Sequence, residues 1–300
     1  MSNVTLKQIV EDLGLDIFWG SELLARKVKK AMLSRPSIEF INYFDYFESD
    51  RIQVIGSKEL AVFNMLNEEE KVERLAKMFS YDSPAYIFTK NVDAPKEFME
   101  AAIKYNIPIL KSPLSTSTLI GNLTFYLSSK LATRKKINGT LMDIHGVGVL
   151  IKGPDGIGKS ETALELVRRG HFLVSDDITV IYEREPGMVL GEAPKLTDRL
   201  MEIKNVGMIN VVNLYGVQAY HSSKRVQLII NLTQEDVETD LNKKEKLFNT
   251  EIQALNIYAS ANRNIATLIE AAALNGRLKR MGQDTGAELE NRMINMVNED

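Results

Sequence analysis

The chain of 300 residues contains no cysteine, one tryptophan and three histidines. The absence of cysteine excludes disulfide bonds, zinc sites built from thiolates and cysteine nucleophiles. The histidines, His145, His171 and His221, are scattered along the sequence, so they do not predict a metal cluster. No apolar run approaches the length of a membrane-spanning helix, and the first residues lack the pattern of a signal peptide. We therefore expect a cytoplasmic protein with no membrane partner.

An excess of positive charge is also missing. The chain has 37 basic and 40 acidic residues, a net charge of −3 and a pI near 5.8. Proteins that bind nucleic acids or membrane surfaces through their general charge are usually basic, so we expect no nucleic-acid partner. With 44% hydrophobic residues, a chain of this length can form the cores of two domains.

The sequence predicts an N-terminal α/β domain over residues 1–134 and a second domain over 135–300. In the first, short apolar runs such as 52–55 alternate with helical patterns such as 68–79, which favours a largely parallel sheet. The polar stretch 132–139 is expected to be a turn-like linker between the domains. The first domain carries no recognisable catalytic constellation.

The stretch 147–160 is the most informative part of the sequence. It begins as a buried strand and breaks into glycines before a helix. Its residues match the phosphate-loop pattern G-x-x-x-x-G-K-[ST], in which glycines let backbone N–H groups point at phosphate oxygens. The lysine of this pattern reaches the β- and γ-phosphates, the serine binds Mg²⁺, and the helix dipole adds positive potential. We expect nucleotide binding by Gly153, Pro154, Asp155, Gly156, Ile157, Gly158, Lys159 and Ser160.

Acidic residues that could serve this loop follow in the sequence. Asp176 and Asp177 end a predicted strand over 171–175, which we expect to lie next to the strand of the loop. Two adjacent carboxylates repel each other, which raises the pKa of one and suits it to accept the proton of a hydroxyl. The alternative is an Asx turn at the end of a strand, which is common. Glu202 offers a hard oxygen ligand for Mg²⁺, and a tight turn at Asn205 precedes a predicted strand over 208–212.

Several of these segments resemble bacterial HPr kinase/phosphorylase. The similar segments include 146–171, 173–177 and 202–211, with further matches at 33–40, 109–114 and 269–282, so the resemblance spans essentially the whole chain. It implies transfer of phosphate from ATP or pyrophosphate to a serine of the phosphocarrier HPr, and phosphorolysis of that seryl-phosphate to pyrophosphate. It also implies a homohexamer whose C-terminal P-loop kinase domain resembles phosphoenolpyruvate carboxykinase.

The resemblance implies roles for particular residues. Lys159 would bind the phosphates, and Ser160 and Glu202 would hold Mg²⁺. Asp177 would be the general base for phosphorylation and the general acid for the reverse step, with Asp176 beside it. The loop around Arg263 and the family's signature segment would serve both directions. That segment comprises Met201, Glu202, Ile203, Lys204, Asn205, Val206, Gly207, Met208, Ile209 and Asn210.

Two positions depart from the family pattern. Asn138 stands where the family has a catalytic histidine, and asparagine can donate a hydrogen bond but does not shuttle a proton. The family also has a catalytic arginine directly after an aspartate, whereas here Asp240 is followed by Leu-Asn-Lys-Lys. Lys243 or Lys244 would supply the positive charge but not the bidentate fork of arginine. We expect the phosphorylase direction to be impaired more than the kinase direction.

Three hypotheses therefore remain open. The first is an HPr kinase/phosphorylase with reduced or one-directional activity. The second is a nucleotide-binding regulatory paralogue with little catalysis. The third is a seryl or small-molecule kinase of the same fold with another substrate.

Overall fold

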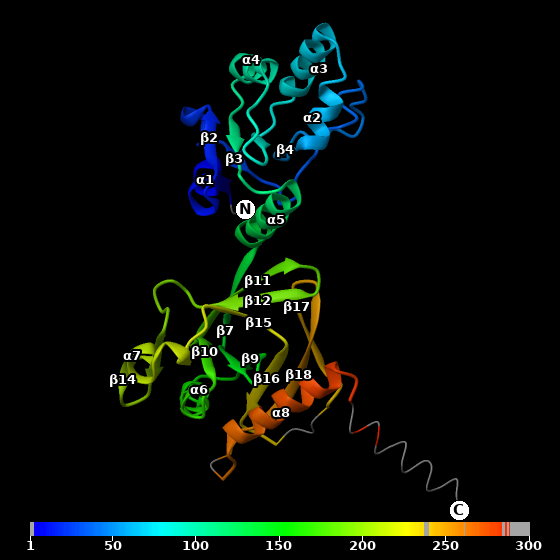
Figure 1. Cartoon of the computed structure of the whole chain (residues 1–300). Coiled ribbons are helices and arrows are strands. Elements are labelled where there is room, and N and C mark those ends of the chain that lie inside the picture. Colours follow the sequence, from blue (N-terminus) through cyan, green and yellow to red (C-terminus); the bar gives the residue numbers. More distant parts are fainter. Residues whose placement is uncertain (1–2, 237–239, 261, 284–285, 287, 289–300) are drawn as a thin grey trace, which may run out of the picture. The chain divides into compact units, whose positions relative to one another are not determined.

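The computed structural model describes residues 3–236, 240–260, 262–283, 286 and 288. By its internal contacts the chain divides into two units, Met1–Thr133 and Arg134–Asp300, each of which is mixed α/β (Figure 1). Among the described residues, no helix combines the length and the apolar character needed to cross a membrane.

The N-terminal unit is built on a four-stranded sheet. Its strands run in the order β2 (Asp16–Trp19), β6 (Ile109–Lys111), β5 (Tyr86–Phe88) and β4 (Gln53–Ile55). The pairs β4–β5 and β5–β6 are parallel, and only β2 pairs antiparallel. The prediction of a largely parallel sheet is therefore confirmed. A short additional pair is formed by β1 (Val4–Thr5) and β3 (Lys27–Val28).

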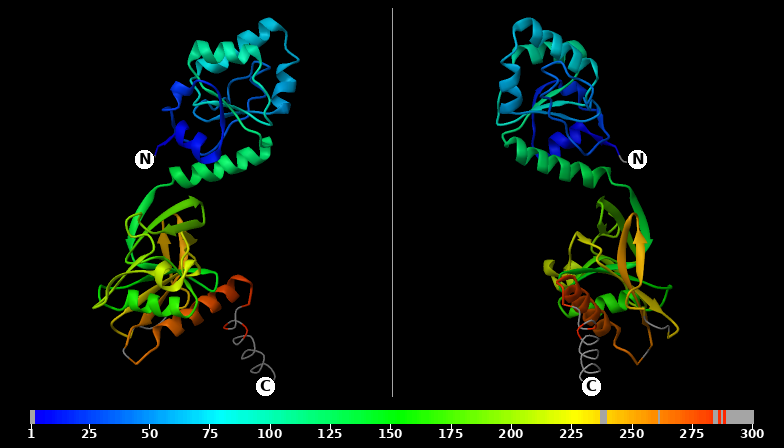
Figure 2. Two further views of the ribbon diagram at one scale, coloured as in Figure 1. Left: turned by 60° about the vertical axis from the view of Figure 1, so that its left-hand side comes forward. Right: turned by 90° about the vertical axis from the view of Figure 1, so that its right-hand side faces the viewer.

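Helices cover both faces of this sheet (Figure 2). One face packs against α2 (Ser57–Phe63), α3 (Glu68–Ser80) and α4 (Lys96–Tyr105), and the other against α1 (Leu6–Leu13) and α5 (Thr116–Leu131). The strands alternate between these two cores, because successive side chains of a strand point to opposite faces. In β5, for example, Tyr86 and Phe88 lie in one core and Ile87 in the other.

The starts of these helices follow local capping chemistry. Carboxylates complement the positive end of a helix dipole, so the acidic run 68–70 predicts the first turn of a helix. This prediction is confirmed: the run opens α3, where Asn67 and Glu70 also form a reciprocal capping box. The sequence predicts a helix over 119–131, but α5 begins earlier, at Thr116, since the Ser115 side chain accepts a hydrogen bond from the N–H of Thr118. Proline is favoured at the first helical position, so the sequence predicts that Pro95 begins a helix; in the structure Pro95 occupies the cap position and α4 begins at Lys96.

The C-terminal unit contains two sheets. The six-stranded sheet has the order β10 (Phe172–Ser175), β8 (Thr140–Ile144), β9 (Val147–Lys152), β16 (Leu228–Thr233), β18 (Thr250–Tyr258) and β17 (Lys244–Leu247). The second sheet has the order β15 (Ser223–Arg225), β12 (Met188–Glu192), β11 (Ile178–Glu185) and β7 (Arg134–Asn138). A separate hairpin is formed by β13 (Leu200–Ile203) and β14 (Gly207–Asn210).

These elements form three layers, as Figures 1 and 2 show. Helices α6 (Lys159–Arg168) and α8 (Ile265–Arg280) pack on one face of the six-stranded sheet, where Val149 and Ile151 of β9 contribute to their core. The opposite face packs against the second sheet, and there Leu150 contributes. The strand that leads into the phosphate loop is thus buried on both sides, which makes it a rigid base for the site.

Three sequence predictions in this unit were wrong. The polar stretch 132–139 is not a turn-like linker, because residues 134–138 form β7, an edge strand of the second sheet. The alternation of apolar and polar residues over 225–232 predicts a single half-buried strand, but the segment is divided between the two sheets as β15 and β16. The strand expected over 208–212 ends at Asn210, whose side chain caps the short helix α7 (Val211–Tyr215).

Candidate active site

The predicted phosphate loop connects β9 to α6. Gly153 has a φ of 156°, and a Cβ there would lie 2.9 Å from the backbone oxygen of Leu232, so a side chain would collide with the neighbouring strand β16. Gly158 caps α6 with a φ of 98°, in the left-handed region that glycine adopts at little cost. The loop therefore takes a conformation that its glycines permit, with the N-terminus of α6 directed into it.

Lys159 lies at the start of α6 with only 7% of its surface exposed. Its Nζ donates hydrogen bonds to the backbone oxygens of Gly153 (2.9 Å) and Pro154 (3.1 Å), and lies 3.6 Å from a carboxylate oxygen of Asp155. The ammonium group is thus held against the loop that it closes. A bound polyphosphate would offer this group a stronger, charge-assisted partner than the two carbonyls.

Asp176 contacts the loop directly. Its carboxylate accepts hydrogen bonds from the Oγ atom of Ser160, at 3.0 Å from each oxygen, from Thr140 Oγ1 (2.8 Å) and from the N–H of Glu202 (3.3 Å). Burial raises the pKa of Asp176 above its ordinary value, and the hydrogen bonds from Thr140 and Ser160 oppose that rise. Burial is therefore the main cause of the raised pKa of Asp176, in place of the repulsion between adjacent carboxylates that we expected from the sequence.

The route by which Asp176 reaches Ser160 differs from the predicted one. Strand β10, which ends just before Asp176, was expected to lie next to the loop strand β9, but β8 separates them. Helix α6 packs over both β8 and β10, so Ser160 in its first turn lies above the end of β10. Thr140, at the start of β8, is a contact of Asp176 that the sequence did not reveal, because only the tertiary structure brings the two residues together.

Asp177 faces the open side of the site. It has a left-handed backbone (φ 59°), and its backbone oxygen accepts a 2.7 Å hydrogen bond from the N–H of Gly139, at the turn from β10 into β11. The chain thus bends at the end of β10, at Asp176 and Asp177. Unlike the buried Asp176, Asp177 lines a cavity of about 520 Å³ next to the phosphate loop.

This cavity brings together predicted residues from four segments. Asn138 comes from the end of β7, Asp177 from the turn after β10, and Glu202 and Lys204 from the hairpin β13–β14. The phosphate loop and the start of α6 contribute Asp155, Gly156, Gly158, Lys159 and Ser160. Carboxylate and hydroxyl oxygens therefore face the loop, which is the donor set that Mg²⁺ prefers.

The signature segment 201–210 forms the hairpin β13–β14, with its tight turn at Asn205 (φ 64°) and Gly207 (φ 98°). Its apolar members have different positions. Met201 and Ile203 are buried in the core between the six-stranded sheet and helices α6 and α8, whereas Val206 and Met208 are exposed. The hairpin is thus anchored by one face while Glu202 and Lys204 reach the cavity.

Other predicted residues lie outside the cavity. Arg263 pairs with Asp236 at 3.7 Å and packs near the ring of Tyr258, in a separate depression beside α8. Lys243 donates to Oδ1 of Asn256 (3.4 Å), and Lys244 pairs with Glu251 (3.3 Å). None of these three cations is among the described residues that line the phosphate-loop cavity.

Comparison with known proteins matches both units of the chain to family models. The model described as HPr Serine kinase N terminus matches residues 4–127, and the model described as HPr Serine kinase C-terminal domain matches residues 129–293. HPr kinase/phosphorylase of Bacillus subtilis (strain 168) is 41% identical over 99% of this chain and 98% of that protein. The same enzyme of Bacillus cereus (strain B4264) is 39% identical over the same shares.

A solved structure is also similar in part. The Hpr(Ser) kinase/phosphatase from Coxiella burnetii is 30% identical, with a TM-score of 0.47, and the match covers 52% of this chain and 98% of that one.

Proposed function

The chain belongs to the HPr kinase/phosphorylase family, and on this premise we propose that it transfers phosphate from ATP or pyrophosphate to a seryl hydroxyl of HPr. The single observation that carries the proposal is the cavity in which Lys159, Ser160, Asp177 and Glu202 meet. These four residues are the minimum set for in-line phosphoryl transfer. The reverse reaction would use inorganic phosphate to remove the seryl-phosphate and release pyrophosphate.

The proposed mechanism follows from the positions of the polar groups. The loop amides and Lys159 hold the polyphosphate, and Asp177, open to the cavity, accepts the proton of the incoming seryl hydroxyl. Ser160, Glu202 and the buried Asp176 would be the oxygen donors for Mg²⁺, which when bound would supply positive charge against the phosphate oxygens. Asn138 can orient a phosphate or hydroxyl but not exchange a proton with it.

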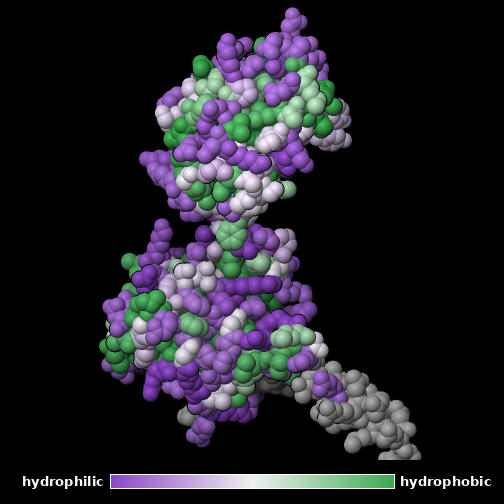
Figure 3. Space-filling view, in the orientation of Figure 1, coloured by the Kyte–Doolittle hydropathy of each residue, from purple (hydrophilic) through white to green (hydrophobic). Residues whose placement is uncertain are grey.

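Exposed apolar side chains beside the cavity support a protein substrate. Val206 and Met208 of the hairpin that carries Glu202 are exposed, as are Leu214 and Val217 just after it. Figure 3 shows apolar surface over β14 and α7. Exposed apolar patches next to a catalytic cavity are typical of surfaces that bind another protein, and a small-molecule kinase would not need one.

We further propose that the C-terminal unit is a P-loop kinase domain of the phosphoenolpyruvate carboxykinase type and that the chain assembles as a homohexamer. Size-exclusion chromatography with light scattering tests the second point. A mass near six times 33.8 kDa would support it, and a monomer would contradict it.

The decisive experiment incubates the full-length protein with labelled ATP, Mg²⁺ and HPr, then locates the label. Labelled HPr serine supports the proposal, and an HPr variant whose target serine is replaced by alanine should remain unlabelled. Nucleotide binding without transfer would favour a regulatory paralogue. Transfer to another protein or small molecule, with HPr unlabelled, would favour a kinase of different substrate.

A further inference from the structure

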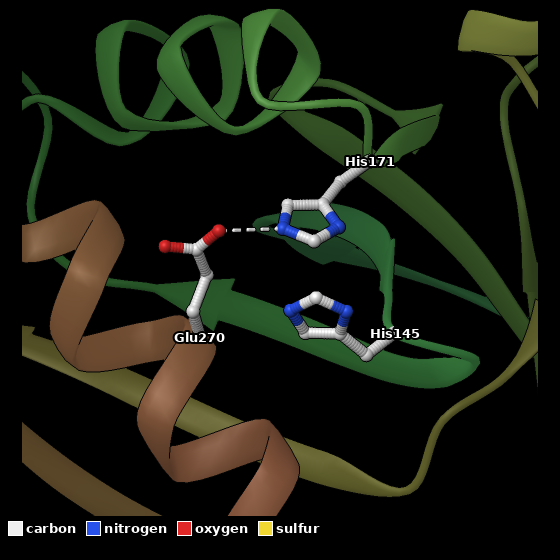
Figure 4. A group of neighbouring side chains, drawn as sticks. All are labelled: His145, His171 and Glu270. Atoms are coloured by element: carbon white, nitrogen blue, oxygen red, sulfur yellow. Dashed lines mark hydrogen bonds and ion pairs between the residues drawn. The ribbon is translucent and has the colours of Figure 1, made fainter.

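Two histidines and a glutamate gather at a second position in the C-terminal unit, away from the phosphate loop. His145, His171 and Glu270 each offer one ligand atom, and these atoms lie within 4.8 Å of one another. Figure 4 shows the three side chains converging from three separate elements. The Nε2 atom of His171 lies 2.8 Å from Glu270 Oε1, and the two imidazole rings are 4.5 Å apart between centroids.

Each donor is positioned by the fold. His145 lies in the tight turn between β8 and β9, with a left-handed φ of 51°, and the guanidinium of Arg277 donates to its backbone oxygen at 3.1 Å. His171 follows the C-terminus of α6 and is 5% exposed. Glu270 lies in α8 and is 20% exposed. The site is therefore buried at His171 and open to solvent at His145.

The carboxylate of Glu270 is oriented by a neighbouring arginine. Arg169 donates to Glu270 Oε2 at 2.7 Å, and hydrogen bonds to Thr267 and Asn264 hold the guanidinium in place. One oxygen, Oε2, is thus held by Arg169, while the other, Oε1, is directed at Nε2 of His171. Metal-binding carboxylates commonly have such an outer partner.

We propose that His145, His171 and Glu270 bind a divalent transition-metal ion, with Zn²⁺ as the expected metal and water as the fourth ligand. Two imidazoles and a carboxylate suit Zn²⁺ and are a poor set for Mg²⁺, which favours oxygen ligands. The C-terminal end of α6 adds negative potential there. The sequence does not reveal this site, because Glu270 lies 125 positions after His145 and only the fold brings them together.

The proposed ion has a structural role. Helix α6 runs from the phosphate loop to this site, and its 10 residues span about 15 Å, which is too far for the ion to contact a bound phosphate. A metal held by these ligands would tie the β8–β9 turn, the start of β10 and α8 together. A simple ion pair between His171 and Glu270 would connect only β10 and α8. The involvement of His145 therefore distinguishes a metal site from an ion pair.

The test is calorimetric titration of the chelator-stripped full-length protein with Zn²⁺, in millimolar Mg²⁺ and without nucleotide. The wild type should bind one Zn²⁺ per chain. His145→Asn should bind at least about 10-fold more weakly, since even outer-shell substitutions cost 10–100-fold. Asparagine tolerates the left-handed backbone of this turn, so the variant should fold. Glu270→Gln is the second variant, and His221→Asn, outside the site, is the matched control that should bind like wild type.

Cobalt gives an independent spectroscopic readout of the same site. Co²⁺-loaded wild type and His221→Asn should show the visible absorption of a tetrahedral ion, and His145→Asn and Glu270→Gln should lose it. Thermal unfolding without metal should be the same for His145→Asn and wild type. A wild type that binds no Zn²⁺, or a His145→Asn variant that binds it as tightly as wild type, overturns the proposal.

Discussion

The hydroxyl oxygen of Ser160 lies 3.0 Å from both carboxylate oxygens of Asp176. This contact separates the roles of two consecutive aspartates. Asp176 is buried against the residue expected to bind Mg²⁺, whereas Asp177 lines the open cavity. Asp176 is therefore suited to bind the metal ion, and Asp177 is suited to contact the substrate hydroxyl.

Burial of Asp176 predicts a pH dependence of stability. Its folded-state pKa is raised above 3.8, so its contribution is fully present below that pH and is lost as pH rises through the folded-state pKa. We expect the free energy of unfolding of the metal-free wild type, relative to Asp176→Asn, to fall as pH rises above 3.8. Each unit between the two pKa values is worth about 1.4 kcal/mol. Urea titrations over a pH series measure this difference, and a difference that does not change with pH would contradict it.

Replacing Asp177 should separate catalysis from binding. Asp177→Asn removes the proposed base while keeping a residue that tolerates φ 59°, so nucleotide affinity should remain near that of wild type. The rate of HPr phosphorylation should fall by about 10²–10⁴-fold. Asp82→Asn is a matched control, because Asp82 has a similar left-handed φ of 57° in the N-terminal unit. Full activity of Asp177→Asn would remove this residue from the mechanism.

Restoring a histidine should favour the reverse reaction. Asn138 and Asp177 line the same cavity, so Asn138→His introduces a proton carrier beside the proposed acid–base group. We expect the ratio of phosphorolysis to phosphorylation to rise by about 10-fold or more. Release of pyrophosphate from seryl-phosphorylated HPr measures the first rate. Asn138→Gln carries no exchangeable charge and should leave the ratio low, so equal ratios in the two variants would count against this explanation.

Two glycines should respond oppositely to alanine. A Cβ on Gly148 in β9 would lie 1.9 Å from the backbone oxygen of Arg225, so Gly148→Ala forces strands apart and should destabilise the C-terminal unit by about 1–3 kcal/mol or more. Gly121 in α5 has no heavy atom within 4 Å of its would-be Cβ, and Gly121→Ala should stabilise by about 0.5–1 kcal/mol. Denaturant unfolding measures both, and destabilisation by Gly121→Ala would show that the helix argument fails.

Prediction from the sequence succeeded where the signal was short-range. The acidic first turn of α3 and the phosphate-loop glycines act through backbone conformations and electrostatic contacts within a few residues. It failed at residues 134–138, which are mostly polar, and at 225–232, where one alternating pattern continues across the point at which the chain passes from one sheet to the other. Strand β7 is mostly exposed at a sheet edge, so it lacks the apolar alternation that marks a half-buried strand.

The sequence by itself determined the phosphate loop, the two-part α/β organisation and the family, because these depend on contiguous residues. Only the tertiary structure decided that Asp176 contacts Ser160, that Arg263 lies away from the cavity, and that His145 lies beside Glu270. These relationships join distant segments. They follow from the order in which the strands pair and from the helices that cover the apolar faces of the sheets. Burial of apolar surface is non-directional. No local sequence pattern therefore specifies which polar groups the folded chain brings together.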